Sequence, residues 1–312
     1  MTRKYFLIVG AAVTTCVLLA FGSSYSSIGA DSIHLNSLDD LTSTIKPERS
    51  NSSAFPQKIW QSWKDDSENP TERTVGFPHQ WRAINPSHRY ERITDANSEA
   101  YITDRLPLSV SRVFSNFTDP ILRADLLRYC VLLVEGGVWA DIDVLPHRPI
   151  SEWVPQQYLE SANLVVGIEN DKHKRPIWRG SPYSVQLVQY TILAKPYHPA
   201  IVGLVERVRG NLESLFQSKS PGDDITFEDV MTTTGPFAFT QVLMDYFTEV
   251  TGTKHTGDEL SNLREPRLIG DVLVLPKDHF GWLPQEHYLE AGDPSILVEH
   301  LFMGSWRGSH PG

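Results

Sequence analysis

The sequence predicts one α/β domain over about residues 55–312 of the 312-residue chain. From Phe55 onward, strand-like segments alternate with helix-like segments, which is typical of a layered α/β domain. The clearest pair is an apolar helix over 120–135 that an apolar strand over 138–145 follows directly. At about 100–200 residues per domain the length also allows two small domains, but the continuous alternation favours one.

Capping residues, Pro and Gly set the boundaries of the predicted elements. Asp119 and Pro120 are suitable N-cap and first-turn residues for the long helix, and the glycine pair at 136–137 ends it. The first strand is predicted over 57–62. Further strands are predicted over 163–168, 271–275 and 295–299, and further helices from about residue 71, over 200–216 and over 235–248.

An uncharged stretch over 5–22 precedes the domain. As a helix, these 18 residues would span about 27 Å, close to the ~30 Å hydrocarbon core of a bilayer. Arg3 and Lys4 precede the stretch, and no Lys or Arg follows it before Lys46. The positive-inside rule therefore predicts a cytosolic tail over 1–4, a transmembrane anchor, and the rest of the chain on the far side. A cleaved signal peptide is the alternative interpretation.

The remaining composition agrees with a domain in the secretory pathway. Residues 23–54 are Ser-rich and predict a flexible stem, with an ordered N-terminal subdomain as the alternative. Two sequons, at Asn51 and Asn116, point the same way. Cys16 lies in the uncharged stretch and Cys130 in the long helix, so no disulfide is expected within the domain. The net charge of -10 argues against a sequence-independent nucleic-acid binder, which needs a basic face.

Two acidic residues, Asp141 and Asp143, mark the end of the strand predicted over 138–145. Alternate side chains of a strand share a face, so the two carboxylates are expected to lie together. Because neighbouring carboxylates repel and are costly to desolvate, a divalent cation with oxygen ligands should sit between them. Such an ion can neutralise a diphosphate leaving group. A polar turn at a strand end is the alternative.

Charged residues also interrupt the apolar helix over 120–135. Asp125 and Arg128 lie three residues apart and therefore share a helix face. The planar guanidinium of Arg128 suits phosphate or a carboxylate network. The alternative is a structural salt bridge, either between Asp125 and Arg128 or between Asp119 and Arg123.

Two further segments carry groups suited to a nucleotide site. His300 follows an apolar stretch and could bind a metal through a neutral imidazole, although a structural histidine is the alternative. The run over 304–306 offers a close-approach backbone, a hydroxyl and a flat ring. In the first predicted strand, the tryptophans within 59–63 could stack on a base.

Taken together, these motifs resemble the DxD-containing glycosyltransferases of family 32. That group includes fungal Golgi mannosyltransferases, chiefly the initiation-specific α-1,6-mannosyltransferase of outer-chain N-glycan synthesis. The signature is carried by RADLLRY at 123–129 and EGGVWADID at 135–143. Further matching segments, in the family's order, are 55–64, 81–86, 233–236 and 300–306.

The resemblance implies a GT-A fold, which is a Rossmann-like mixed sheet flanked by helices. It implies Mn2+ as the metal, GDP-mannose as the donor and a mannose-terminated N-glycan as the acceptor. The implied product linkage is α-1,6 and forms with retention of configuration. A front-face mechanism, which needs no protein nucleophile, is preferred. The anchor and stem imply a single-pass type II Golgi membrane protein with a lumenal domain, which could belong to a Golgi mannosyltransferase complex.

The resemblance also implies a role for individual residues. As metal ligands it implies Asp141, Asp143 and His300, of which the two aspartates are also the catalytic pair. As donor contacts it implies Gln61, Trp63, Asp125, Arg128, Tyr129, Asp141, Ser305 and Trp306. As acceptor contacts it implies Thr234 and Gly235.

Three alternatives remain open at this point. Within the family, another nucleotide sugar or a lipid acceptor would replace GDP-mannose or the N-glycan. A haloacid-dehalogenase-type phosphatase resembles the segment 141–145, but it wants a further acid four or five residues after Gly270-Asp271, where Leu275 and Pro276 stand. A non-catalytic glycan-binding or scaffold subunit of a Golgi complex is the third.

Overall fold

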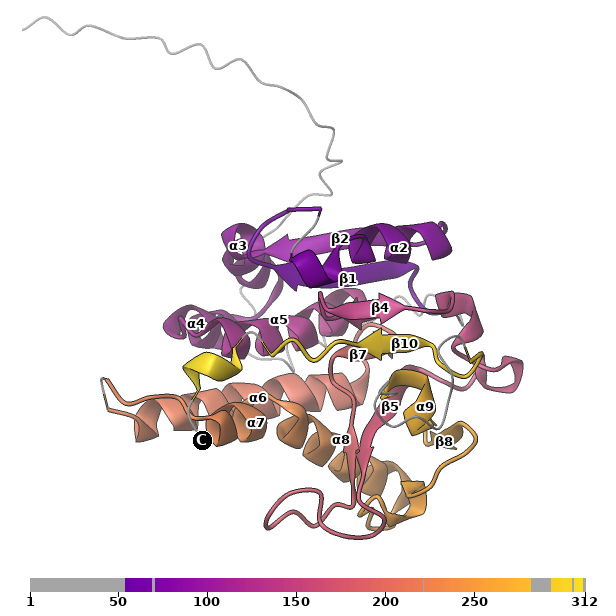
Figure 1. The fold of residues 1–312 in the computed structure, drawn as a ribbon. Coiled ribbons are helices and arrows are strands. Elements are labelled where there is room, and N and C mark those ends of the chain that lie inside the picture. Colours follow the sequence, from indigo (N-terminus) through magenta and orange to yellow (C-terminus); the bar gives the residue numbers. More distant parts are fainter. Residues whose placement is uncertain (1–53, 69–70, 221, 282–292, 305, 311–312) are drawn as a thin grey trace, which may run out of the picture. The chain divides into compact units, whose positions relative to one another are not determined.

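A mixed eight-stranded β-sheet organises the computed structural model of the chain (Figure 1). Its order is β2-β1-β3-β7-β5-β9-β8, with β6 paired to β5. The strands are β1 (Lys58–Trp63), β2 (Arg89–Thr94), β3 (Gly137–Ala140), β5 (Leu164–Asp171), β6 (Val185–Leu187), β7 (Thr191–Ala194), β8 (Arg267–Ile269) and β9 (Val272–Leu275). β1 is parallel to both β2 and β3, and β5 is parallel to β9, whereas β7 is antiparallel to β3 and β5. A separate antiparallel pair joins β4 (Val144–Pro146) to β10 (Val298–His300).

The structure describes residues 54–68, 71–220, 222–281, 293–304 and 306–310. The chain divides into two units, Met1–Ile33 and His34–Gly312, and every described residue belongs to the second. The predicted tail and anchor, and the stem up to residue 53, lie outside the described residues. Within the described ranges, no helix has the length and apolar character needed to cross a membrane. The domain boundaries therefore stay a prediction.

Helices cover both faces of the sheet. The α-helices are α2 (Phe77–Ile84), α3 (Asp95–Arg105), α4 (Leu108–Asn116), α5 (Pro120–Glu135), α6 (Pro199–Ser218), α7 (Phe227–Thr233), α8 (Pro236–Thr251) and α9 (Lys277–Phe280). Short 3-10 turns cover Glu72–Thr74, Ile150–Glu152, Gln156–Tyr158, Asp258–Leu260 and Arg307–Ser309. Side chains of β9 alternate between two cores: Val272 and Val274 join the core beneath α5, α6 and α8, whereas Leu273 and Leu275 join the opposite core. This period-two alternation explains why the strand is apolar throughout.

Helix α5 follows from its local sequence. The Asp119 carboxylate accepts hydrogen bonds from the backbone N–H groups of Ile121 (3.1 Å) and Leu122 (3.4 Å), which satisfies the exposed start of the helix. At its other end the chain reverses through Gly137, whose φ is 88° and where a Cβ would lie 2.6 Å from the Lys58 carbonyl oxygen. The glycine pair thus lets β3 begin immediately after α5 and against β1.

Many of the predicted elements are confirmed. The α/β class holds, α5 has the predicted bounds, and buried Cys130 lies on it as a free thiol. The elements that lie within a few residues of their predicted positions are β1, β5, β9, β10, α6 and α8. The helix expected from about residue 71 is only a 3-10 turn there, since α2 begins after Gly76 at φ 81°. The elements that were not predicted are β2, β6, β7, β8, α3, α4, α7 and α9.

The prediction of one strand over 138–145 is wrong. β3 ends at Ala140, and β4 begins at Val144 and pairs with β10 instead of joining the large sheet. Between them the chain turns, because the Val144 N–H donates to the Asp141 carbonyl (3.0 Å). Asp141 and Asp143 therefore lie in a turn at the strand end and not on an extended strand.

We expect Gly137→Ala to lower the free energy of unfolding by about 2–4 kcal/mol, because the new Cβ would collide with the β1 backbone at a left-handed φ. Gly203→Ala is the matched control: Gly203 lies inside α6, a Cβ there meets nothing within 4 Å, and helix propensity favours alanine by about 0.5–1 kcal/mol. Chemical denaturation of both variants measures the difference. Equal stability of Gly137→Ala and the unaltered chain would contradict this account.

Candidate functional site

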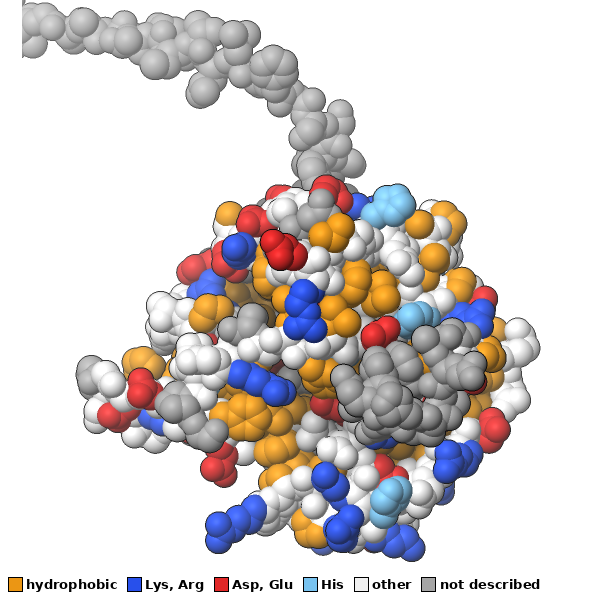
Figure 2. All heavy atoms as spheres, viewed as in Figure 1, with side chains coloured by type: hydrophobic (Ala, Val, Ile, Leu, Met, Phe, Trp, Pro, Cys, Tyr) orange, Lys and Arg blue, Asp and Glu red, His pale blue; other side chains and the backbone are white. Residues whose placement is uncertain are grey.

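A cavity of about 610 Å³ lies where the parallel strands β1 and β3 end. Carboxyl ends of neighbouring parallel strands are the usual place for a ligand site in α/β folds. The predicted site residues that line it are Trp63, Asp125, Arg128, Asp141, Asp143, His300 and Trp306. They come from β1, α5, the turn after β3, β10 and the C-terminal segment. Figure 2 shows hydrophobic side chains, with a few basic ones among them, over the middle of the domain. In the same view in Figure 1, β10 crosses this region.

Arg128 joins two carboxylates at the wall of this cavity. Its Nη1 donates to Asp125 Oδ1 (2.6 Å), and its Nη2 donates to Asp141 Oδ1 and Oδ2 (2.8 and 3.1 Å). The second oxygen of Asp125 accepts the Thr234 hydroxyl (2.7 Å). The salt bridge between Asp125 and Arg128 thus exists and faces the cavity, so the two interpretations of this pair are compatible.

Burial sets the protonation of this network. Desolvation raises the pKa of Asp125 to about 6, although Arg128 and the Thr234 hydroxyl act in the opposite direction. Burial alone would lower the pKa of Arg128, but the adjacent Asp141 and Asp125 carboxylates raise it above its ordinary value. Arg128 therefore stays a cation, and Nε of its guanidinium has no hydrogen-bond partner among the described residues. The cavity wall here is a cation held between acids.

Asp141, Asp143 and His300 form a group that could hold a metal ion. One ligand atom from each lies within 4.8 Å of the others. The pairing of His300 with Val144 across β10 and β4 carries the imidazole to the aspartate turn, where its Nε2 is 3.2 Å from Asp143 Oδ1. Two carboxylates and an imidazole are a donor set that suits Mn2+ and similar divalent cations. The residues present therefore fit such an ion.

Backbone groups hold Asp143 in this position. The Met303 N–H donates to its Oδ2 (3.0 Å), and the Leu301 N–H donates to its carbonyl oxygen (3.0 Å). Burial would raise the pKa of Asp143, but the hydrogen bonds from His300 and Met303 bring it below its ordinary value. Asp143 is thus an ionised carboxylate ready to bind a cation. The His300 ring itself lies 3.9 Å, centroid to centroid, from the Tyr190 ring.

Four predicted contact residues do not line the cavity: Gln61, Tyr129, Thr234 and Gly235. Gln61 is buried, and its Nε2 donates to the Asp141 carbonyl (2.9 Å), so it supports the aspartate turn. Tyr129 donates through its hydroxyl to the Gln189 side chain and the Thr234 carbonyl. Gly235 precedes α8, and a Cβ there would lie 2.8 Å from the Val230 carbonyl oxygen. Ser305 lies outside the described residues. The roles assigned to these residues stay predictions.

The cavity also contains groups that the sequence did not reveal. Glu169 lines it near the end of β5, and Gln186 Nε2 donates to its carboxylate (2.8 Å). Burial raises the pKa of Glu169. Gln189 and Arg307 also line the cavity. Glu169 follows an apolar predicted strand, which is the sequence pattern that pointed to Asp141, so the same pattern could have identified Glu169. Gln189 and Arg307 have no comparable sequence pattern.

The chain is similar to known glycosyltransferases. A family model described as "Glycosyltransferase sugar-binding region containing DXD motif" matches residues 52–160. The "Initiation-specific alpha-1,6-mannosyltransferase" of Schizosaccharomyces pombe is 35% identical over 81% of this chain, and the chain spans 64% of that relative's length. The protein of the same name from Candida albicans is 28% identical over 82% of this chain and 73% of the relative. A solved structure, "PaToxG Glycosyltransferase", is 14% identical with a TM-score of 0.44 and covers 64% of this chain and 72% of that chain.

The raised pKa of Asp125 predicts a pH-dependent stability difference. At about 6, against an ordinary 3.8, the folded chain binds this proton more tightly than the unfolded chain. Ionising Asp125 therefore costs folding free energy as the pH rises from about 4 to 6. The unfolding free energy of Asp125→Asn minus that of the unaltered chain should grow across this interval by about 3 kcal/mol, and stay constant above it. Denaturation at a series of pH values measures this difference. The exposed Asp104→Asn is the control, and a pH-independent difference for Asp125→Asn would exclude the mechanism.

Proposed function

Because this chain belongs to the DXD-containing glycosyltransferase family, we propose that it transfers mannose from GDP-mannose to a mannose-terminated N-glycan. The product linkage is α-1,6, formed with retention of configuration. The observation that carries the proposal is the convergence of Asp141, Asp143 and His300 on one point of the cavity, with the Arg128 cation beside it. A cavity that combines a metal-binding group with a fixed cation suits a nucleotide diphosphate.

Each wall of the cavity has its own task in this reaction. Asp141, Asp143 and His300 would hold a divalent cation, Mn2+ in this proposal, which when bound neutralises the charge of the departing diphosphate. Arg128 and Asp125 orient the donor sugar through the network that Thr234 completes. Trp63 offers a ring for the base, and its Nε1 has no hydrogen-bond partner among the described residues.

In this proposal the acceptor approaches from the side of α7 and α8. Met231, on α7, and Pro236, at the start of α8, line the cavity, and Thr234 and Gly235 lie between them in the sequence. In a front-face reaction the leaving diphosphate oxygen takes the proton of the acceptor hydroxyl, and no protein group is needed as the base. The role of these residues is then to position the acceptor. The mannosyl assignment is supported by the names of the relatives above. We extend it to a type II Golgi membrane protein with a lumenal domain, anchored by residues 5–22 and working in a mannosyltransferase complex.

Turnover of a panel of nucleotide sugars tests the donor. The full chain, supplied with Mn2+, should hydrolyse or transfer from GDP-mannose at least tenfold faster than from UDP-sugars. Asp143→Asn should lower this rate by about 100-fold or more, because it removes a charged ligand from the metal site. Product release is followed by chromatography, with mannose-terminated glycans and lipid acceptors compared in parallel. Equal rates with UDP-sugars would overturn the mannosyl assignment, and an unchanged rate in Asp143→Asn would overturn the metal site.

Removal of the imidazole tests the third ligand. We expect His300→Ala to weaken Mn2+-dependent binding of GDP at least tenfold, since one of three protein ligands is lost. His255→Ala is the matched control, because His255 is paired with Glu259 and lines no part of the cavity. Calorimetric Mn2+ titrations in the presence of GDP measure both. If His300→Ala titrates like the unaltered chain, His300 does not bind the metal.

A further inference from the structure

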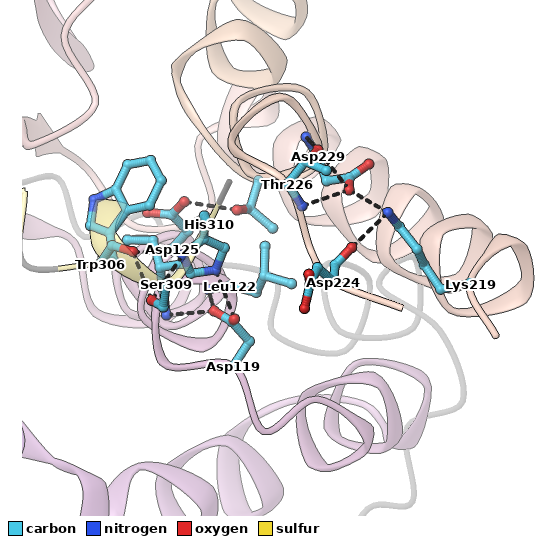
Figure 3. A network of polar contacts seen from close by, with 12 residues as sticks. Asp119, Leu122, Asp125, Lys219, Asp224, Thr226, Asp229, Trp306, Ser309 and His310 are labelled. Atoms are coloured by element: carbon cyan, nitrogen blue, oxygen red, sulfur yellow. Dashed lines mark hydrogen bonds and ion pairs between the residues drawn. The ribbon is translucent and has the colours of Figure 1, made fainter. Parts of the chain in front are cut away.

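A buried histidine ties the C-terminal segment to the start of α5. His310 is 5% exposed. Its Nε2 lies 2.8 Å from Asp119 Oδ2, and its Nδ1 lies 2.7 Å from the Trp306 carbonyl oxygen (Figure 3). The Ser309 hydroxyl is a further neighbour of Nδ1, at 3.2 Å. No part of the proposed reaction uses this histidine.

Both contacts are hydrogen bonds at the same time only if both ring nitrogens carry a proton. A carboxylate and a backbone carbonyl can only accept hydrogen bonds, so both ring nitrogens must donate. Only the doubly protonated, cationic imidazole has two N–H groups. His310 in this arrangement is therefore an imidazolium, and the loss of either proton breaks one of the two bonds.

Asp119 divides its two oxygens between two tasks. Oδ1 caps α5 by accepting from the N–H groups of Ile121 and Leu122, and Oδ2 accepts from His310. Asp125 and Arg128 stand on the following turns of the same helix. The pair between His310 and Asp119 therefore connects the C-terminal segment to the helix that carries the donor-binding network.

The stretch that His310 holds faces the cavity. Trp306 and Arg307 both line it. The Trp306 ring stacks on Phe227 of α7, with centroids 5.5 Å apart and planes at 9°. The guanidinium of Arg307 lies over the same Phe227 ring, at 6.0 Å. A ring and a cation at the edge of a nucleotide-sugar cavity are groups whose placement should affect the affinity for the donor.

We propose that His310 and Asp119 form a positioning latch that closes while His310 is protonated and seats Trp306 and Arg307 for donor binding. Donor affinity then falls as the pH rises and His310 loses its proton. This inference rests on the proposed function only for the identity of the ligand in the cavity. His310 touches no reacting atom and acts through Trp306 and Arg307.

The charged surroundings of His310 favour this role. Asp119, at the start of α5, is its ionic partner, and Arg307 lies on its own segment. The next cation on α5, Arg123, points elsewhere, because its Nη1 donates to the Phe114 and Phe117 carbonyls. On α7, Asp229 is paired with Lys219 at 2.6 Å, and Glu228 is exposed. Figure 3 also draws Asp229 with its partners Thr226 and Lys219.

Two variants test the latch, so that the test does not depend on whether one particular variant folds. Asp119→Asn keeps an N-cap of comparable quality but removes the carboxylate that His310 needs. His310→Gln removes the imidazole ring. The affinity for GDP with Mn2+ is measured by calorimetry on the full chain between about pH 5 and 8, where histidines generally titrate. Toward the acidic end both variants should bind about tenfold more weakly than the unaltered chain, and the difference should vanish toward pH 8.

The ratio of the GDP affinity of each variant to that of the unaltered chain separates the effect of the latch from any effect of pH on the metal site. The metal-site residues are unchanged in all of these proteins, so the readout is the pH dependence of the affinity ratio. His255→Gln, remote from the cavity lining, should leave that ratio at one. A ratio near one at every pH for Asp119→Asn and His310→Gln would overturn the proposal, as would a ratio that is constant but different from one.

A second measurement separates this inference from the proposed function. If the unaltered chain binds no GDP with Mn2+, the proposed donor fails, and the latch is judged by amide hydrogen exchange. The Ser309 and His310 amides, which donate to the Trp306 and Arg307 carbonyls, should then exchange at least tenfold faster in His310→Gln at acidic pH and equally fast at pH 8. Equal exchange at acidic pH overturns the latch.

Discussion

The buried guanidinium of Arg128 is the interaction on which the site depends. A charge without a partner in this position would be very costly, so two carboxylates must meet it, one on its own helix and one on the turn after β3. Asp125 is three residues away and comes into contact through helix geometry alone. Asp141 is brought there by the close connection between α5 and β3. The glycine pair at 136–137 makes that connection short enough.

Around this interaction the fold adds neutral donors to Asp141. The Trp139 indole N–H donates to its carboxylate (2.8 Å), and the Gln61 amide donates to its carbonyl. Gln61 is in turn held by the Tyr90 hydroxyl (2.6 Å). β2, β1 and β3, which are neighbours in this order in the sheet, thus all contribute to holding one aspartate. A charged group held by several fixed partners is pre-organised for a ligand.

The opposite side of the site is built by the last part of the chain. β10 pairs with β4 and not with the large sheet, and this small second sheet brings His300 to Asp143, 157 residues earlier in the sequence. The segment then passes the cavity edge and returns to α5 at Asp119. Both ends of this segment are therefore fixed to elements that carry the central carboxylates. Placement of the C-terminal residues and integrity of the carboxylate network are physically linked.

The sequence by itself determined the α/β class, helix α5 with its cap, and the aspartates as a candidate metal pair. These are local properties: capping, glycine conformation and hydrophobic periodicity act over a few residues. Only the tertiary structure decided that Asp141 and Asp143 share a turn, because a period-two pattern continues through residues 138–145 whether or not the backbone stays extended. Short strands such as β6 and β7 were missed because three or four residues carry too little pattern. The contacts of Glu169, Thr234, His300 and His310 join residues far apart in sequence, and only the folded backbone brings such groups within hydrogen-bonding distance.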